Sequence, residues 1–204
     1  MKPSSSHPLS KAPAGRKPVL LAIVGMSGTG KSEAAKYLAR SYGLASFYMG
    51  GVVLGEVERL GLPDSPKNER KVREQLRRRL GMDAIARLAL PSLRKFFKSE
   101  RTVLLDGLYS AEELTLLRGY PGEFTVVVIA VHSNRALRYS RLKTRVVRPL
   151  TPAEVDLRDR TELQKLNKAP PIVLADFHVC NNGTTRSLHR SLRSVMTELG
   201  APHP

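Results

Sequence analysis

The residues with the clearest chemistry lie near the start of the chain, in the segment Gly25-Met26-Ser27-Gly28-Thr29-Gly30-Lys31-Ser32. The segment matches G-x-x-x-x-G-K-[ST] in full, a pattern whose glycine-rich turn surrounds nucleotide phosphates with backbone N–H groups. In this pattern the lysine reaches the β- and γ-phosphates, and the hydroxyl of the last residue ligates Mg²⁺. A glycine-rich turn without a ligand is the alternative. An apolar run before the segment and a helical pattern after it favour a phosphate-binding loop (P-loop). The expected ATP-binding residues are Gly25, Ser27, Gly28, Thr29, Gly30, Lys31 and Ser32.

A carboxylate is the second candidate group. The apolar sequence Val103-Leu104-Leu105 ends in Asp106-Gly107. At the carboxyl end of a core strand, an aspartate can hold Mg²⁺ through water or accept the proton of an attacking hydroxyl. A turn residue that caps the next segment is the alternative. We expect Ser32 and Asp106 to be the metal ligands, and Lys31 and Asp106 to be catalytic.

The third candidate group is a run of cations without acids. Six basic residues precede the turn Pro149-Leu150-Thr151, namely Arg135, Arg138, Arg141, Lys143, Arg145 and Arg148. Arginine can bond the charge that spreads over a phosphoryl group during its transfer. A solvated basic helix is the alternative. The residues nearest the turn, Arg141, Arg145 and Arg148, are the predicted catalytic arginines.

Other residues carry weaker signals. Arg70, Arg73 and Arg77 recur at helical spacing, and either a solvated helix or a grip on a substrate phosphate explains them. Tyr109 could line an acceptor site or pack in the core. For His132 we expect a structural role. The remaining expectations are a buried, unreactive Cys180 and a turn at Asn181-Asn182-Gly183 that could contact a nucleotide base.

Composition excludes several classes of protein. The chain has 204 residues, 41% of them hydrophobic, which suits one domain with its own core. A single cysteine excludes a disulfide scaffold, and no apolar run approaches the roughly 20 residues that span a bilayer. We therefore expect a cytoplasmic protein without a membrane partner. The net charge of +16 implies anionic partners, such as nucleotides, phosphorylated metabolites or nucleic acid.

Apolar runs and helical periodicity alternate along the chain. Strands are predicted at 19–24, 44–49, 102–105, 124–131 and 176–180. Helices are predicted at 32–42, 52–60, 66–98 with breaks near Gly81 and Pro91, 134–143 and 188–199, and two more begin after Ser110 and Thr151. This alternation predicts an α/β fold with a mostly parallel sheet covered by helices on both faces. Residues 1–18, rich in proline and lacking acids, are predicted to be a disordered basic tail.

These motifs, in this order, resemble the adenylate-kinase-like and dephospho-CoA-kinase-like P-loop kinases. The resemblance covers residues 19–199 and is closest to a poorly characterised branch found in archaea and bacteria. The stretches 68–79, 106–110 and 145–151 carry the similarity to that branch. The resemblance implies a three-layer P-loop NTPase fold with five parallel strands. It also implies an acceptor-binding helical segment at about 50–100 and a lid at about 138–155.

The resemblance further implies transfer of the γ-phosphoryl group of Mg-ATP to a small phosphorylated acceptor, with a nucleoside monophosphate or related nucleotide favoured. Dephospho-CoA kinase activity is the enzymatic alternative, and an ATP-dependent nucleic-acid-binding or regulatory protein is the alternative from another class. The segment Gly50-Gly51-Val52-Val53-Leu54 lacks the polar residues of adenylate kinases proper. A phosphate of the acceptor would therefore be held elsewhere, by Arg70 or Arg73.

Overall fold

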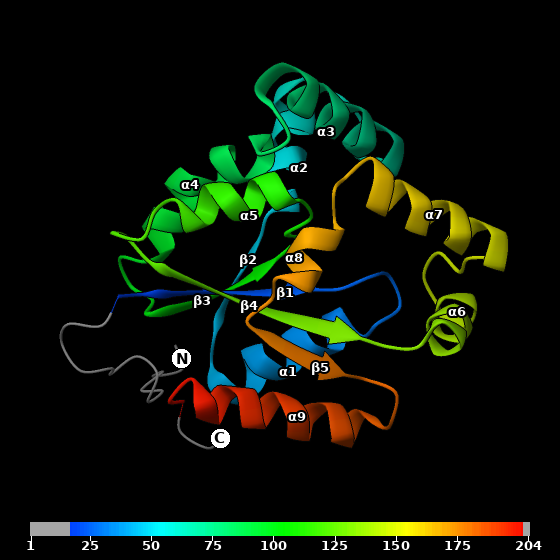
Figure 1. The fold of residues 1–204 in the computed structure, drawn as a ribbon. Helices are drawn as coiled ribbons and strands as arrows, with labels where there is room; N and C mark the ends of the chain where they lie inside the picture. Colours follow the sequence, from blue (N-terminus) through cyan, green and yellow to red (C-terminus); the bar gives the residue numbers. More distant parts are fainter. Residues whose placement is uncertain (1–16, 202–204) are drawn as a thin grey trace, which may run out of the picture.

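The structure, a computed structural model, describes residues 17–201, so the predicted tail lies almost entirely outside the described residues. Its centre is a sheet of five strands, β1 (Val19–Val24), β2 (Ala45–Tyr48), β3 (Thr102–Asp106), β4 (Thr125–His132) and β5 (Phe177–Cys180). All pairings are parallel and the strand order is β2-β3-β1-β4-β5. The predicted parallel α/β sheet is confirmed (Figure 1).

Helices cover both faces of the sheet (Figure 1). On one face lie α1 (Lys31–Tyr42) and α9 (Thr185–Glu198), which pack against Leu21 and Ile23 of β1. On the other face lie α2 (Gly50–Arg59), α3 (Pro66–Leu80), α4 (Ala84–Phe96), α5 (Ala111–Arg118) and α8 (Ala169–Val173). Leu20, Ala22 and Val24 face this second layer, so β1 is buried on both sides and its sequence is continuously apolar.

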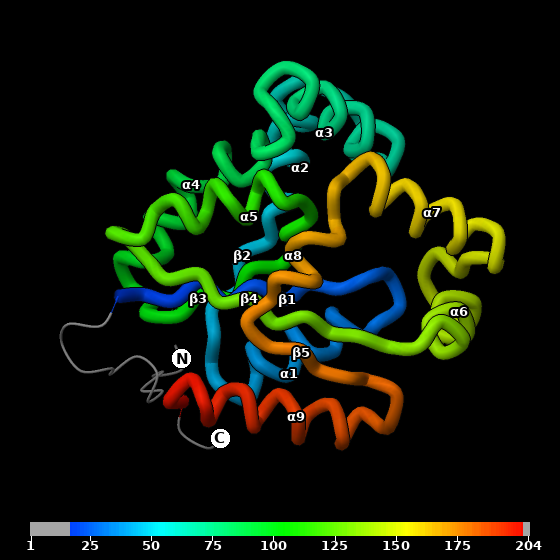
Figure 2. The backbone as a smooth tube through the Cα atoms, viewed as in Figure 1, coloured from blue at the N-terminus to red at the C-terminus, as the bar shows by residue number. Residues whose placement is uncertain are grey.

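Two further helices, α6 (Arg135–Thr144) and α7 (Pro152–Gln164), lie beyond the carboxyl end of β4. The tube in Figure 2 follows the chain from β4 through α6 and α7 and returns through α8 to β5. The predicted capping box at Thr151 and Glu154 starts α7, with each residue accepting a hydrogen bond from the backbone of the other. Within the described residues, no helix is both long and apolar enough to cross a membrane.

Two local predictions are wrong. Pro91 does not end a helix, because α4 continues through it and buries Leu90 and Leu93 on its apolar face. Burial of these side chains outweighs the single helical hydrogen bond that proline removes. Cys180 is exposed rather than buried, because it ends the edge strand β5 and points away from the core side that Val179 occupies.

Candidate functional site

The P-loop joins β1 to α1, as predicted, and its three motif glycines have positive φ angles of 144°, 82° and 98° at Gly25, Gly28 and Gly30. Each glycine is also closely approached by another segment. A Cβ atom would lie 2.4 Å from the carbonyl oxygen of Val131 at Gly25 and 2.8 Å from that of Arg138 at Gly28. A side chain at these positions would open the loop, so the glycines are required by both conformation and packing.

Hydrogen bonds from three directions hold the loop. Arg138 of α6 donates from Nε to the carbonyl of Ser27 at 2.7 Å. The buried amide of Asn181 donates to the carbonyl of Thr29 at 2.8 Å, and Ser133 donates to the same oxygen at 3.3 Å. The predicted turn at Asn181-Asn182-Gly183 follows β5, and the Asn181 side chain within it supports the P-loop, a contact that the sequence did not indicate. These bonds orient the carbonyls, and the loop conformation is therefore set by its surroundings.

Lys31 is the first residue of α1, and its ammonium donates to the carbonyl of Met26 at 2.9 Å. Burial, and after it the charge of the nearby Lys168 ammonium, lower the pKa of Lys31, while Glu162 and Asp106 raise it, and the net result is a pKa of about 7. A phosphate bound beside this amine would raise its pKa and favour the charged ammonium.

Asp106 is the last residue of β3, paired in register with Ile23 of β1, and it is exposed. Its predicted position at the carboxyl end of the strand beside the P-loop is confirmed. Its charge acts on Lys31, as the pKa of that lysine shows. Asp106 and Ser32, at the start of α1, both supply oxygen ligands of the type that Mg²⁺ prefers.

The sequence did not identify a buried charge network that joins α7 to the P-loop. The Ser27 hydroxyl donates to Oε1 of Glu162 at 3.1 Å, and Arg158 donates to the same oxygen at 2.9 Å. Lys168 donates to Oε2 at 2.7 Å. Burial would raise the pKa of Glu162, but the two cations outweigh it and hold that pKa at about 2. No motif marks these residues, because Glu162 and Lys168 lie in an ordinary polar helix and the turn after it.

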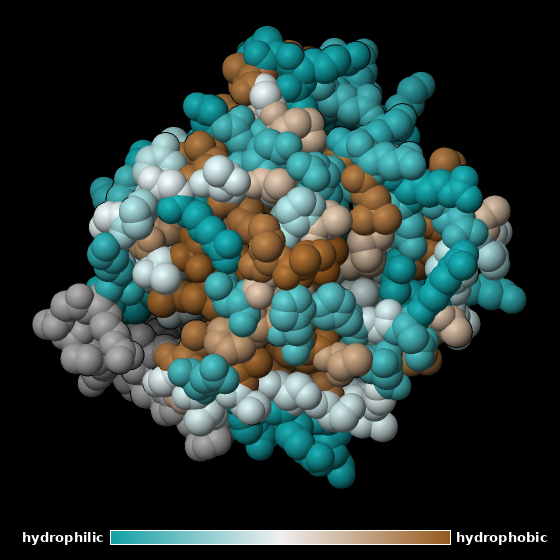
Figure 3. Space-filling view, in the orientation of Figure 1, coloured by the Kyte–Doolittle hydropathy of each residue, from teal (hydrophilic) through white to brown (hydrophobic). Residues whose placement is uncertain are grey.

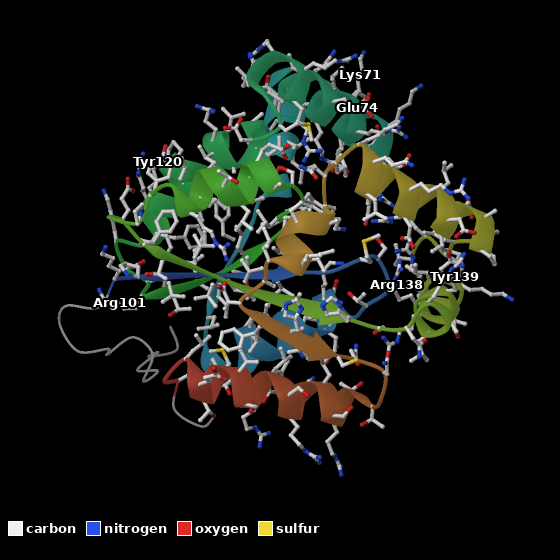
Figure 4. The ribbon with its side chains drawn as sticks, viewed as in Figure 1. Lys71, Glu74, Arg101, Tyr120, Arg138 and Tyr139 are labelled. Carbon is white, nitrogen blue, oxygen red and sulfur yellow. The ribbon has the colours of Figure 1, made fainter. Side chains whose placement is uncertain are left out.

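The predicted catalytic arginines lie in different surroundings. Arg141 donates to Oγ of Ser133 at 2.8 Å and to the carbonyl of Asn181 at 3.0 Å, next to the P-loop. Arg145 and Arg148 lie between α6 and α7, where Nε of Arg145 bonds the carbonyl of Arg148. The buried residue of this run is Arg138, which also pairs with Asp159 of α7 at 2.6 Å (Figure 4). Arg138 therefore links α6, α7 and the P-loop.

Two cavities that share lining residues lie between α3 and α7. The outer cavity, of about 700 Å³, is lined by Arg70, Arg73, Glu74, Arg77, Arg78, Met82, Arg158, Thr161, Lys165 and Leu166. The inner cavity, of about 130 Å³, extends toward Tyr48, Gly107, Tyr109 and Glu162. The two share Arg73, Arg77, Arg158 and Leu166. Arg73, expected at an acceptor phosphate, lines both cavities, and Arg70 lines the outer one.

Two of the weaker candidates find defined partners. Tyr109 lines the inner cavity, with the Lys168 ammonium 4.9 Å from the centre of its ring, and burial raises the pKa of Tyr109 to about 12. His132 lies against His178 of β5, with Nε2 and Nδ1 3.0 Å apart. Tyr109 therefore belongs to the cavity, whereas His132 contributes a contact between neighbouring strands.

Glu113 fixes the wall of the inner cavity. Ser110 accepts a hydrogen bond from the backbone N–H of Glu113 at 3.1 Å, as the capping-box spacing predicts. The Glu113 carboxylate, however, accepts from the backbone of Tyr109 at 2.8 Å and pairs with Arg77 at 3.0 Å. Glu113, the residue that the capping-box spacing singled out, therefore positions Arg77 and Tyr109 in the cavity wall.

Comparisons with known proteins agree with this architecture. A family model described as an AAA domain matches residues 24–155. A UPF0200 protein of Thermococcus sibiricus is 32% identical over 184 residues, which are 89% of this chain and 96% of that protein. A UPF0200 protein of Methanoculleus marisnigri is 33% identical over 184 residues, with 89% and 97% covered.

Solved structures show the same fold. TT1252 from Thermus thermophilus aligns with a TM-score of 0.56 and 22% identity, over 90% of this chain and 99% of that one. Shikimate kinase from Bacteroides thetaiotaomicron aligns with a TM-score of 0.53 and 16% identity, over 89% and 98%. The fold is therefore the α/β fold of P-loop kinases, and its loop is of the nucleotide-binding type.

Proposed function

This chain belongs to the UPF0200 protein family, and we propose that it is an ATP-dependent phosphotransferase that moves the γ-phosphoryl group of Mg-ATP to a small acceptor. One observation carries the proposal. The P-loop is joined through Ser27 and Glu162 to the wall of a basic cavity large enough for a second substrate. A protein that only binds a nucleotide needs no such second site beside its phosphate loop.

In this proposal the P-loop binds the triphosphate of ATP through its backbone N–H groups, and Lys31 bonds the β- and γ-phosphates. Ser32 and Asp106 would hold Mg²⁺, which neutralises phosphate charge and polarises the transferring group. The Ser27–Glu162 hydrogen bond keeps α7 against the loop. The chain's own work is therefore to bind and orient two anionic substrates and to exclude water from between them.

The segment from Arg138 to Val155 is the proposed lid. The candidates for bonding the transferring phosphoryl group are Arg141, Arg145 and Arg148, since they lie at or beside the turn that joins α6 to α7. The proposed acceptor is a nucleoside monophosphate or a related nucleotide, and dephospho-CoA is the second candidate.

A second function has one observation in its favour. A basic surface on α9 lies apart from the inner and outer cavities. It consists of Arg186, His189, Arg190 and Arg193. Such a surface can bind the phosphates of a nucleic acid. Binding to random-sequence DNA, measured at several salt concentrations with and without residues 1–18, tests this function. Tight, salt-sensitive binding together with absent phosphoryl transfer would favour it over the kinase.

The direct test of the kinase is ADP release from Mg-ATP in the presence of nucleoside monophosphates or dephospho-CoA. We expect release that depends on the acceptor and is abolished by Lys31→Ala, with the fold unchanged by circular dichroism. ATP binding without acceptor-dependent ADP release for any phosphorylated acceptor would argue against a phosphotransferase. Unchanged turnover of the Lys31→Ala variant would overturn the role of the P-loop.

A further inference from the structure

We propose that the acceptor carries an anionic group separate from the hydroxyl that receives the phosphoryl group, and that this anionic group binds in the outer cavity. The acceptor class is therefore a hydroxyl-bearing phosphate ester or diphosphate. Among the acceptors proposed above, the inference favours dephospho-CoA, or a nucleotide phosphorylated on a sugar hydroxyl, over a nucleoside monophosphate phosphorylated on its own phosphate. The inference rests on the proposed phosphotransferase function and specifies its substrate.

The sizes of the two cavities indicate which part of the acceptor each one can hold. The inner cavity, of about 130 Å³, includes Gly107, which directly follows Asp106, and Glu162, which bonds the P-loop. The outer cavity has about 700 Å³ and lies further from the loop, between α3 and α7. Only a small group reaches the inner cavity, and the larger part of the acceptor lies in the outer one.

The outer cavity is strongly cationic. Its lining holds six cations, and Glu74 is the one carboxylate among the described residues that line it. Glu74 pairs with Arg70 at 2.9 Å, while Arg77 and Arg158 pair with Glu113 and Glu162 outside the lining. Figure 4 labels Glu74 on the side of α3 near α7, and Figure 3 shows hydrophilic residues over α3.

Three cations of the lining have no close carboxylate partner. Arg73 lies 3.8 Å from Glu69, and Arg78 and Lys165 interact with Glu74 electrostatically but form no close ion pair with any residue between 17 and 201. Cations gathered around one cavity repel each other, and a bound anion removes that repulsion. The charge at the far end of the acceptor is therefore negative.

A buried donor supports the same conclusion. Arg77 is 8% exposed and lines both cavities. One of its terminal nitrogens bonds Glu113, but its Nε has no hydrogen-bond partner among residues 17–201. This N–H is itself sealed from solvent, so an anion in the cavity would interact with the charge of the Arg77 guanidinium rather than with Nε.

The apolar lining argues against a nucleobase in the outer cavity. Met82 and Leu166 are its hydrophobic residues, and no aromatic side chain lines it within the described part of the chain. Bases are held chiefly by stacking on aromatic rings, and the tyrosines of this region, Tyr48 and Tyr109, line the inner cavity instead. The outer cavity therefore suits a phosphate or diphosphate better than a base.

The reaction that follows balances without a further reactant. The acceptor hydroxyl oxygen bonds to the γ-phosphorus, and the bond from that phosphorus to the bridging oxygen of the β-phosphate breaks. ADP leaves with the electron pair of that bond. The hydroxyl proton is released to water, and the product carries two separate phosphate groups.

Binding of pyrophosphate to the full-length protein tests the anionic site. The P-loop is first saturated with a non-hydrolysable ATP analogue, and pyrophosphate is then titrated by calorimetry. We expect binding that weakens at least about tenfold in the double variant Arg78→Met, Lys165→Met. Arg79→Met is the matched control, since Arg79 is exposed on the same helix but does not line the outer cavity. Absent binding, or equal affinity in all three proteins, would overturn the inference.

The chemistry of the product tests the separate hydroxyl. The protein is incubated with Mg-ATP and either adenosine 5′-monophosphate or dephospho-CoA, each of which has both phosphate and hydroxyl groups, and products are examined by ³¹P NMR. A new phosphate ester on the acceptor supports the inference. Conversion of the acceptor's own phosphate to a phosphoanhydride, seen with adenosine 5′-monophosphate as two ADP formed per ATP consumed, contradicts it and leaves the kinase proposal intact. If neither compound reacts, the pyrophosphate titration decides. Failure of the ATP analogue to bind would contradict the proposed function itself.

Discussion

The Glu162 carboxylate of α7 and the Ser27 hydroxyl of the P-loop lie 3.1 Å apart, although 135 residues separate them in the chain. Glu162 also bonds Lys168 and Arg158, so one carboxylate connects the P-loop, α7 and the cavity wall. The position of α7 and the conformation of the P-loop are therefore linked through this residue, and its negative charge is stabilised by both cations.

The pH dependence of stability should report the Glu162 charge. Its pKa in the folded protein, about 2, lies below its ordinary value of 4.5, so its contribution is complete above pH 4.5 and is lost as the pH falls toward 2. The shift corresponds to a contribution on the order of 3 kcal/mol. Urea unfolding from pH 7 to pH 2.5 should show a flatter profile for Glu162→Gln than for the wild type. The exposed control Glu58→Gln should follow the wild type, and parallel profiles for all three would disprove the network's contribution.

ATP binding should be accompanied by proton uptake at Lys31. Its pKa of about 7 leaves the amine mostly neutral at pH 8, and the charge of a bound triphosphate raises that pKa. Calorimetry at pH 8 in buffers of different ionisation enthalpy should show uptake of about one proton per ATP. Lys31→Met should remove this uptake. Equal uptake by Lys31→Met and the wild type would mean that another group takes the proton.

Asp106→Asn should lower phosphoryl transfer by at least about a hundredfold, the effect of losing a metal ligand or proton acceptor. Because Asp106 is exposed at the end of β3, the substitution should leave the unfolding midpoint nearly unchanged. Steady-state rates at several Mg²⁺ concentrations measure both effects. An unchanged rate and Mg²⁺ dependence would reduce Asp106 to a turn residue.

Arg145→Ala and Arg148→Ala should lower kcat by at least about a hundredfold while changing ATP affinity only modestly, since a lid arginine meets the charge that develops during transfer. Arg148 is exposed and Arg145 is half-buried beside the turn, so neither substitution removes a core contact. Separate measurement of kcat and the Kd for ATP distinguishes the roles. Weakened ATP binding with kcat preserved would assign these arginines to ground-state phosphate binding.

Arg138→Ala should behave differently, because Arg138 is buried and bonds both Ser27 and Asp159. Removing it leaves Asp159 without its partner and should destabilise the protein by about 3 kcal/mol. Arg138→Lys keeps the charge but not the two-sided bonding, and it should recover part of the stability and little of the ATP affinity. Full ATP affinity in Arg138→Ala would show that the loop holds its conformation without this contact.

The sequence by itself determined the features that depend on neighbouring residues. The P-loop between β1 and α1, the position of Asp106 after β3 and the Thr151 capping box all follow from spacing within a few residues. The five parallel strands could be predicted because strands buried on both faces have continuous apolar runs and alternate with helices. Such patterns are complete within one segment and need no knowledge of its partners.

Only the tertiary structure decided which charges are buried together. Arg138 and Arg141 have similar sequence surroundings, yet Arg138 is buried against the P-loop and Asp159, while Arg141 braces Asn181. Glu162 and Lys168 look like surface residues in sequence, and folding buries both, with Glu162 bonded to Ser27 and Lys168 bonded to Glu162. The energy of a buried charge depends on partners that are distant in the chain, and local sequence patterns therefore cannot reveal it.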